Sequence, residues 1–449
     1  MKSENRYRVC SRLLHAITFF VPSFVVVAAL PEIEQSSVEF RQVNTKATIS
    51  YELKNAPAIV TLDIETNTLS DASGEWVSIG GENMQTLSGD VHKVIRAGAR
   101  KITWQSRAEW PEKSIPAGQI RAVVTAWPTN APPDYLVIGL DAKNDVRLYA
   151  KPDFVPYGIN SDYYKTNAIL MRKIPAAGVV WCMGAPNDEL EVSKENEIPH
   201  LVMLTADYYM GVYELTQGQL VKFYKDSKNK PKNPSNFKDQ EDSLMRPAEK
   251  LDMTLLRGMK DYSNEDEFCW PSSGYDNIAV ESIIYQLRTK CGLSQIDLPT
   301  EAQWEYACRA GTTTAYNNGS SASRGTMELV GWFANNSSAQ THVVGLKQGN
   351  DWGLYDMHGN VQEFCLDRMA LKEQFTPLLV HDYASGGVTV DPIGPQADAE
   401  GINRKSTARR GGGYSFSYDN CRSGSRSSGT YYNDDPWAGC RLCTPAVFK

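Results

Sequence analysis

One segment in the second half of the chain limits the kind of fold that the sequence can form. Residues 353–364 read Gly-Leu-Tyr-Asp-Met-His-Gly-Asn-Val-Gln-Glu-Phe, so glycines and acidic groups alternate with side chains typical of a core. Glycine weakens the interior of helices and strands, and acidic groups resist burial unless they are paired. The sequence therefore predicts a tight, irregular loop here, inside a domain that depends on loops for its core.

The acidic residues of this loop have two interpretations. Asp356 and Glu363 can supply carboxylate oxygens to a hard cation, with carbonyl oxygens of the turn completing its coordination. Alternatively, the loop is irregular and its acids are solvated or accept hydrogen bonds from nearby main-chain N–H groups. Both interpretations stay open on the residues alone.

Length and charge limit the class of protein. A chain of 449 residues is too long for one typical core and predicts two or three domains. Hydrophobic residues make up 41% and the formal net charge is −7, so the composition is that of a folded, mildly acidic protein. We therefore expect no nucleic acid partner.

The first 29 residues are typical of an export signal. Four basic residues precede an apolar run over 13–29, which ends in the small residues that signal peptidases prefer. An uncleaved anchor is the alternative, because the run approaches the ~20 residues needed to span a bilayer. The sequence predicts a secreted, periplasmic or cell-surface protein, with a membrane contact only if the signal is retained.

Residues 31–150 are predicted to form an antiparallel β-sandwich of immunoglobulin or fibronectin type. Apolar and polar residues alternate over 47–53 and 59–64, and further candidate strands are 101–104, 121–127 and 135–140. The segment holds no cysteine, and its single histidine, His92, is interpreted as a surface or structural residue. We expect a spacer or interaction module, joined through 151–167 to a second domain over 168–449.

The second domain has two clear helix starts and a cysteine-rich sequence. Thr216 with Gln219, and Thr300 with Gln303, each match the capping box that begins a helix. A further helix is predicted over 278–290, and the segment 225–275 is a polar insertion. All cysteines after residue 30 lie between Cys182 and Cys443, which marks a domain boundary before them and makes them disulfide candidates in an oxidising compartment.

Ordered motifs in this domain resemble the formylglycine-generating enzyme family, whose members are also called sulfatase-modifying factor domains. The resemblance covers about residues 168–447. The segments that carry it are, in chain order, Ile174–Gly178, Met183–Gly184, Tyr213–Gln217, Leu298–Gly311, Gly353–Phe364, Arg410–Tyr414 and Cys421–Arg426. It implies an α+β fold related to C-type lectins, with little regular secondary structure.

The resemblance also implies a structural calcium ion at the loop described first. The corresponding family motif binds calcium through one Asn or Asp side chain, two main-chain carbonyls and one Glu side chain. Carried over position by position, the calcium ligands here are Asp356, the carbonyls of Gly359 and Val361, and Glu363. These are oxygen donors suited to a hard ion.

The chain departs from the family at the position of its copper chemistry. Aerobic members hold copper(I) between two closely spaced cysteines after a Gly-Gly-Ser motif and oxidise a substrate cysteine to formylglycine. Here Gly413 replaces the serine, Gln362 replaces a tryptophan, and Cys421 is the one cysteine in the segment. A copper bis-thiolate needs two soft ligands, so the sequence argues against copper. Cys421 is then at most a weak catalytic candidate, and no other catalytic residue is indicated.

Family members carry cysteines at similar positions, which implies two disulfides. One would join Cys308 to Cys421, and the other would join Cys291 to Cys443, with Cys440 as the alternative mate. Each such bond typically contributes about 2–4 kcal/mol to stability.

Two functions follow from these observations. The first is an exported binding or structural module, stabilised by calcium, for a protein, peptide or glycan ligand. The aromatic tail over 414–437 suits a binding surface, although its rings could equally pack the loops. The alternative function is an oxidase of the formylglycine-generating type acting on exported sulfatases or other substrates.

Overall fold

The computed structural model describes most of the chain between residues 29 and 448. It leaves out residues 70, 72, 112–115, 117, 187–188, 190–196, 225–232, 259–277, 369–386 and 395–405. The predicted signal segment through residue 28, parts of the 225–275 insertion and Cys269 therefore lie outside the described residues. Among the residues that are described, no helix is long and apolar enough to cross a bilayer.

The described chain folds into two compact units. The smaller unit comprises 29–138, Asp145–Tyr164 and the end of the chain from Ala446. The larger unit comprises Gly139–Asn144 and Lys165–Pro445.

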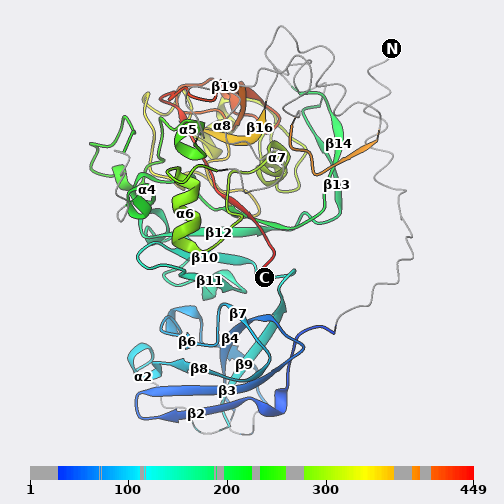
Figure 1. Ribbon diagram of the computed structural model, residues 1–449, viewed down its shortest axis with the longest axis vertical. Coiled ribbons are helices and arrows are strands. Elements are labelled where there is room, and N and C mark those ends of the chain that lie inside the picture. Colours follow the sequence, from blue (N-terminus) through cyan, green and yellow to red (C-terminus); the bar gives the residue numbers. More distant parts are fainter. Residues whose placement is uncertain are drawn as a thin grey trace. The chain divides into compact units, whose positions relative to one another are not determined.

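The smaller unit contains two antiparallel sheets (Figure 1). In one sheet the order is β1-β3-β8-β6, with β2 also paired to β3; in the other it is β5-β4-β7, with β9 also paired to β4. The strands are β1 (Glu32–Ile33), β2 (Glu39–Val43), β3 (Lys46–Lys54), β4 (Ala58–Asn67), β5 (Trp76–Ser78), β6 (Ser88–Gly89), β7 (Val94–Ile95), β8 (Gly98–Trp104) and β9 (Ile120–Pro128), with the short helix α2 (Ser106–Glu109).

Alternating burial forms the core between these sheets. Along β3, every second residue from Ala47 to Leu53 is buried and the intervening ones are not. On β4 the core-facing residues are Ala58, Val60, Leu62 and Ile64. The period-2 pattern predicted for 47–53 is therefore confirmed, because β3 places one side of its pleat against the opposite sheet. On β4 the residues between the core-facing ones are partly buried too, since Ile59 and Thr61 are both buried.

The end of the segment predicted as a sandwich forms β11 (Val146–Tyr149), which pairs antiparallel with β10 (Tyr135–Gly139). The predicted linker 151–167 contains a 3₁₀ turn, η3 (Pro152–Phe154), and the short helix α3 (Tyr163–Thr166). Main-chain groups of this stretch are thus held in defined turns.

The larger unit mixes short strands with short helices, which confirms the α+β fold class. Its strands are β12 (Ala168–Ile174), β13 (Val179–Met183), β14 (His200–Leu204), β15 (Tyr208–Gly211), β16 (Gln362–Arg368), β17 (Val388–Val390), β18 (Ser406–Arg410), β19 (Ser427–Thr430), β20 (Ala438–Gly439) and β21 (Cys443–Pro445). Its helices are α4 (Gln217–Tyr224), α5 (Met253–Leu256), α6 (Ile283–Cys291), α7 (Glu301–Arg309) and α8 (Arg324–Val330).

Both predicted capping boxes are present. Thr300 Oγ1 accepts a hydrogen bond from Gln303 N, and the Gln303 side chain accepts one from Thr300 N. Thr216 and Gln219 make the same reciprocal pair at the start of α4. The helix predicted from residue 278 begins instead at Ile283, because Ser282 caps it by accepting a hydrogen bond from Tyr285 N.

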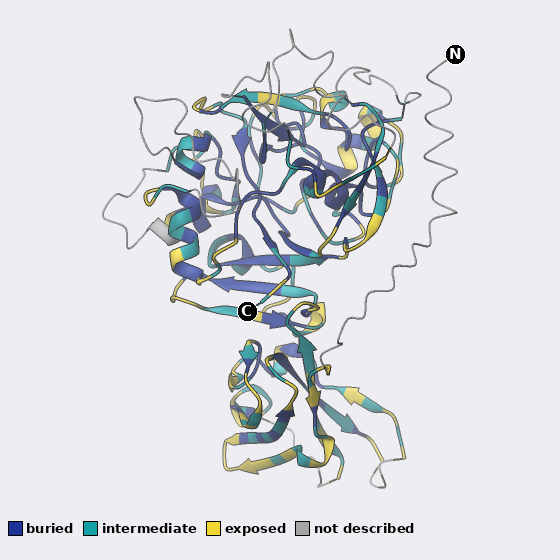
Figure 2. Ribbon diagram, turned by 45° about the vertical axis from the view of Figure 1, so that its right-hand side comes forward, coloured by how far each residue is buried: buried dark blue, intermediate teal, exposed yellow. Residues whose placement is uncertain are grey.

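The interior segments of the larger unit are mostly buried (Figure 2). Its core combines aromatic packing with buried ion pairs. Trp304 on α7 is fully buried beside the strands. Glu305 on the same helix pairs with Arg309 and with Arg410 of β18, and all three side chains are buried. Because these three buried charges are paired with one another, the core tolerates them.

Candidate functional site

The predicted loop is a turn that leads into a strand. Its backbone has left-handed φ angles at Asp356 (58°), Gly359 (109°) and Asn360 (62°). A Cβ at Gly359 would lie against Trp332 O, so a side chain cannot be added there without moving the backbone. The expectation of an irregular loop through residue 364 is corrected at its end, because Gln362 and Glu363 begin β16 and pair with β20.

Glu363 occupies the centre of a buried network. Its carboxylate accepts a hydrogen bond from Trp304 Nε1 at 2.6 Å and three from the Arg441 guanidinium at 2.7–3.0 Å. Arg441 also donates to the carbonyls of Gly211, Val212 and Tyr355. The guanidinium thus ties the turn to β15 and to the segment before β21.

A second carboxylate, Glu214, supports the turn from the other side. Its oxygens accept hydrogen bonds from Asn360 Nδ2 at 2.7 Å and from Val361 N at 3.0 Å. Burial raises the pKa of Glu214 well above its usual range, and the negative charges of Asp356 and Glu363 raise it further. Sequence reasoning did not identify Glu214 as part of this site.

Asp356 is the third buried carboxylate of the cluster. Its Oδ2 accepts a hydrogen bond from Gly345 N at 2.6 Å, whereas its Oδ1 is buried and has no hydrogen-bond partner among the described residues. Burial raises the pKa of Asp356 to about 6. A buried carboxylate oxygen without a partner is costly, so it calls for a proton or a cation.

The predicted calcium ligands offer oxygen atoms of the kind that a hard cation takes. Three carboxylates face the positive charge of Arg441, and Asp356 keeps a free oxygen donor. Glu363 already accepts hydrogen bonds from Arg441, so it would share its oxygens between the guanidinium and an ion. Within the described chain, no group of three or more His, Cys, Asp or Glu side chains could hold a metal alone, so the carbonyls of Gly359 and Val361 would be needed. The calcium site stays a prediction.

The segment after β18 places Cys421 in an apolar, closed environment. Cys421 is fully buried, its Sγ contacts Ser417 O at 3.6 Å, and Gly412 packs so close that a Cβ there would meet the sulfur. Burial raises the pKa of the Cys421 thiol to about 12. The thiolate is the form that binds soft metals and attacks substrates, and this environment disfavours it.

Gln362, which replaces the family tryptophan, has a structural role in this unit. Its side-chain Nε2 donates to Ser427 Oγ at 2.7 Å and its main-chain N donates to Trp437 O at 2.7 Å. Nearby aromatic rings pack against each other, as in the edge-on contact of Phe416 with Trp437 at 5.7 Å. Tyr431 is buried, while Tyr432 is half exposed, so the aromatic tail mainly packs loops.

The predicted disulfide partners are all buried free thiols here. Cys308 Sγ contacts Ser423 Oγ and His358 Nε2, both at 3.7 Å, and His358 Nδ1 is hydrogen-bonded to Cys421 O at 2.7 Å. His358 therefore lies between the two residues. Cys291 accepts a hydrogen bond from Leu293 N, and Cys443 contacts Gln303. The structure joins no pair among the cysteines that it describes, and both predicted disulfides stay predictions.

Comparison with known proteins agrees with this architecture. Residues 173–446 match the family described as the sulfatase-modifying factor enzyme 1-like domain. A relative is the chaperone protein LppX of Paenibacillus barcinonensis, 31% identical over 186 residues, which cover 36% of this chain and 62% of that protein. Another is the formylglycine-generating enzyme of Mycobacterium tuberculosis, 41% identical over 76 residues, which cover 15% of this chain and 25% of that enzyme.

Among solved structures, Treponema denticola variable protein 1 matches 64% of this chain and 97% of its own, with 24% identity and a TM-score of 0.44. The chain spans less than two thirds of the length of either of the two curated relatives named above. The family match covers more than half of the chain. This protein belongs to the sulfatase-modifying factor enzyme 1-like family.

Proposed function

We propose that this protein is an exported, calcium-stabilised binding or structural module without copper-dependent oxidase activity. The observation that carries the proposal is the environment of Cys421, a lone buried thiol whose pKa is raised to about 12. Copper(I) requires thiolate ligands, and this position disfavours even one. The ligand would be a protein, peptide or glycan.

The comparisons support a binding role. The relative that matches over the longer stretch is named a chaperone, a protein that acts by binding. The alternative, an oxidase that forms formylglycine, is favoured by the shorter match to a formylglycine-generating enzyme. The two functions differ in a product that can be measured.

An oxidase assay separates them. The purified full-length chain is incubated with copper(I), oxygen and a peptide containing Cys-x-Pro-x-Arg, and the peptide is analysed by mass spectrometry. We expect no formylglycine above the level of a reaction without protein. An active formylglycine-generating enzyme is the positive control. Formylglycine produced over repeated turnovers would overturn the proposal, and its loss on the substitution Cys421→Ser would then assign the activity to this thiol.

Calcium stabilisation has its own prediction. Chelation should lower the melting temperature of the larger unit by about 5 °C, because a ligand at 100 times its Kd contributes about 2.7 kcal/mol. Asp356→Ala should abolish this response, since it removes both carboxylate oxygens, including the one that lacks a partner. Differential scanning calorimetry with and without a chelator measures both.

The matched control is Asp351→Ala, which alters an exposed aspartate close by in the sequence. It should leave the response to chelation unchanged. An identical melting curve of the unmodified protein with and without chelator, after calcium loading, would refute the site.

A further inference from the structure

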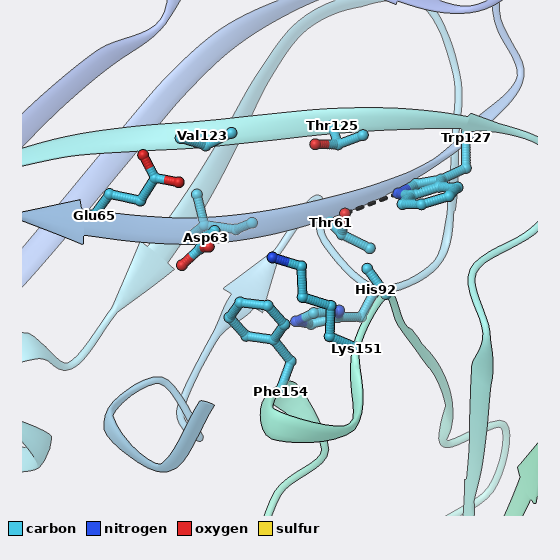
Figure 3. A pocket seen from close by; sticks show the side chains of 11 residues that line it. Thr61, Asp63, Glu65, His92, Val123, Thr125, Trp127, Lys151 and Phe154 are labelled. Carbon is cyan, nitrogen blue, oxygen red and sulfur yellow. Dashed lines mark hydrogen bonds between the residues drawn. The ribbon is translucent and has the colours of Figure 1, made fainter. Parts of the chain in front are cut away.

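A cavity lies within the smaller unit, on the outer face of the sheet formed by β4 and β9 (Figure 3). Its volume is about 210 Å³. Its walls come from both strands, from the loop that carries His92 and from the turn at 150–154. The lining residues are Thr61, Leu62, Asp63, Glu65, His92, Val123, Thr125, Trp127, Ala150, Lys151 and Phe154.

Strand register explains why these side chains gather. Even-numbered residues of β4 face the core, so Thr61, Asp63 and Glu65 project from the opposite face. On β9 their partners are Thr125, Val123 and Arg121 respectively. The turn containing Lys151 and Phe154 lies over this face, which a sandwich normally exposes to water, and leaves a partly open pocket at which Thr125 and Lys151 are exposed.

Two aromatic rings give the cavity rigid apolar surfaces. The Trp127 indole is fixed because its Nε1 donates to Thr61 Oγ1 at 2.9 Å. The Phe154 ring lies beneath the amine of Lys151, with Nζ 5.6 Å from the ring centroid. A fixed ring binds a ligand without losing rotamer entropy, so these surfaces are preorganised.

The polar side chains that line the cavity carry both positive and negative charge, and some of their hydrogen-bonding atoms are available to a ligand. Asp63 Oδ1 accepts a hydrogen bond from Ser78 Oγ at 2.7 Å, which orients the carboxylate and leaves it able to accept more. Lys151 Nζ contacts the Phe154 ring and forms no ion pair with any carboxylate in the described part of the chain. The Glu65 carboxylate forms an ion pair with Arg121, with 2.6 Å between Oε2 and Nη2.

This arrangement selects against ions of either sign. A cation would meet the charge of Lys151, and an anion would meet that of Asp63. A neutral ligand with several hydroxyl groups can donate to Asp63 and accept from Lys151, while an apolar face of C–H groups lies on an aromatic ring. The volume is below the roughly 300–1,000 Å³ usual for drug-sized ligands, so one small ring suits it.

We propose that this cavity binds a single neutral sugar ring, with Trp127 and Phe154 as apolar contacts and with Asp63 and Lys151 as hydrogen-bond partners. The site lies wholly within the smaller unit and does not depend on calcium or on the chemistry near Cys421. Sugar binding at this cavity is therefore independent of whether the larger unit binds calcium or forms formylglycine.

Titration of the full-length chain with glucose, galactose, mannose and N-acetylglucosamine, followed by calorimetry and by NMR of the tryptophan indole N–H groups, tests the proposal. We expect saturable binding of at least one sugar with a Kd of about 1 mM. Asp63→Asn and Lys151→Met should each weaken it about tenfold or more, because the first replaces a charged acceptor oxygen by an NH2 donor and the second removes a charged donor. Neither substitution should change the NMR signals of residues elsewhere in the smaller unit.

The control variant is Lys101→Met, which alters an exposed lysine on the outer face of the other sheet. This variant should bind the sugar as tightly as the unmodified chain does. The proposal is wrong if none of the four sugars saturates the site, or if both cavity variants bind as the unmodified chain does. Tighter binding of glycine, alanine or leucine than of any sugar would also overturn it, because the opposite charges of Asp63 and Lys151 would then be recognising a zwitterion.

Discussion

Replacing Arg441 with methionine should destabilise the larger unit by about 3–5 kcal/mol, because the change leaves a buried carboxylate without its counter-charge. Arg441 and Glu363 are both buried, and the guanidinium also donates to three main-chain carbonyls. Methionine keeps an unbranched side chain of similar length, so the main loss is charge and hydrogen bonding. Urea denaturation, with hydrogen exchange to assign the transition to this unit, measures the effect.

The matched control is Arg324→Met, which removes an ion pair with Glu328 on the surface of α8. Both side chains of this pair are about half exposed, and such pairs contribute at most about 1 kcal/mol. If Arg441→Met were no more destabilising than Arg324→Met, the network around Glu363 would not be holding the unit together.

Acid should weaken the smaller unit through His92. Burial lowers the pKa of His92 to about 4, whereas an unfolded histidine titrates near 6.5. Between pH 6.5 and 4 the unfolded state therefore binds one proton more than the folded state does. The contribution of neutral His92 to the free energy of unfolding is fully present above pH 6.5 and is lost as the pH falls through 4. The total loss is about 3 kcal/mol.

His92→Asn should remove this acid dependence, because asparagine does not titrate and tolerates the left-handed φ of 59° at this position. Hydrogen exchange of amides in 29–138, corrected for intrinsic rates, gives the stability of the unit at each pH. His200→Asn, in the other unit, is the control and should leave these amides unchanged. An acid dependence that persists in His92→Asn would assign it to other groups.

Local patterns in the sequence predicted much of the fold. The alternation along 47–53 predicted β3 because one face of that strand packs against the second sheet. The capping pairs predicted the starts of α4 and α7 because both of their hydrogen bonds join residues three apart. The start of α6 was misplaced, since the apolar stripe begins before the residue that caps the helix.

The residues around Glu363 could not be found in this way. Glu363 contacts Arg441, 78 positions later, and Trp304, 59 positions earlier. Neither spacing carries a local signal, because long-range contacts depend on how the strands and loops assemble. Arg441 and Glu214 each lie in a short apolar segment, where a buried charge is unusual without a partner. That mismatch was the one available signal.

The cavity in the smaller unit escaped prediction for a related reason. Thr61 and Asp63 occupy the polar positions of an alternating strand, which normally face water. Lys151 and Phe154 were assigned to a linker, so nothing indicated that they would cover this face. His92, interpreted as surface or structural, is buried and contributes to the wall.

The position of Arg441 in the chain has a consequence for biosynthesis. This residue and β21 are among the last parts of the larger unit to be made, yet they contact β15 and the turn at Asp356. Until they emerge from the ribosome, Glu363 has no counter-charge and β15 lacks its pairing with β21. The smaller unit can complete its two sheets earlier, so the two parts acquire their native structure at different times during translation.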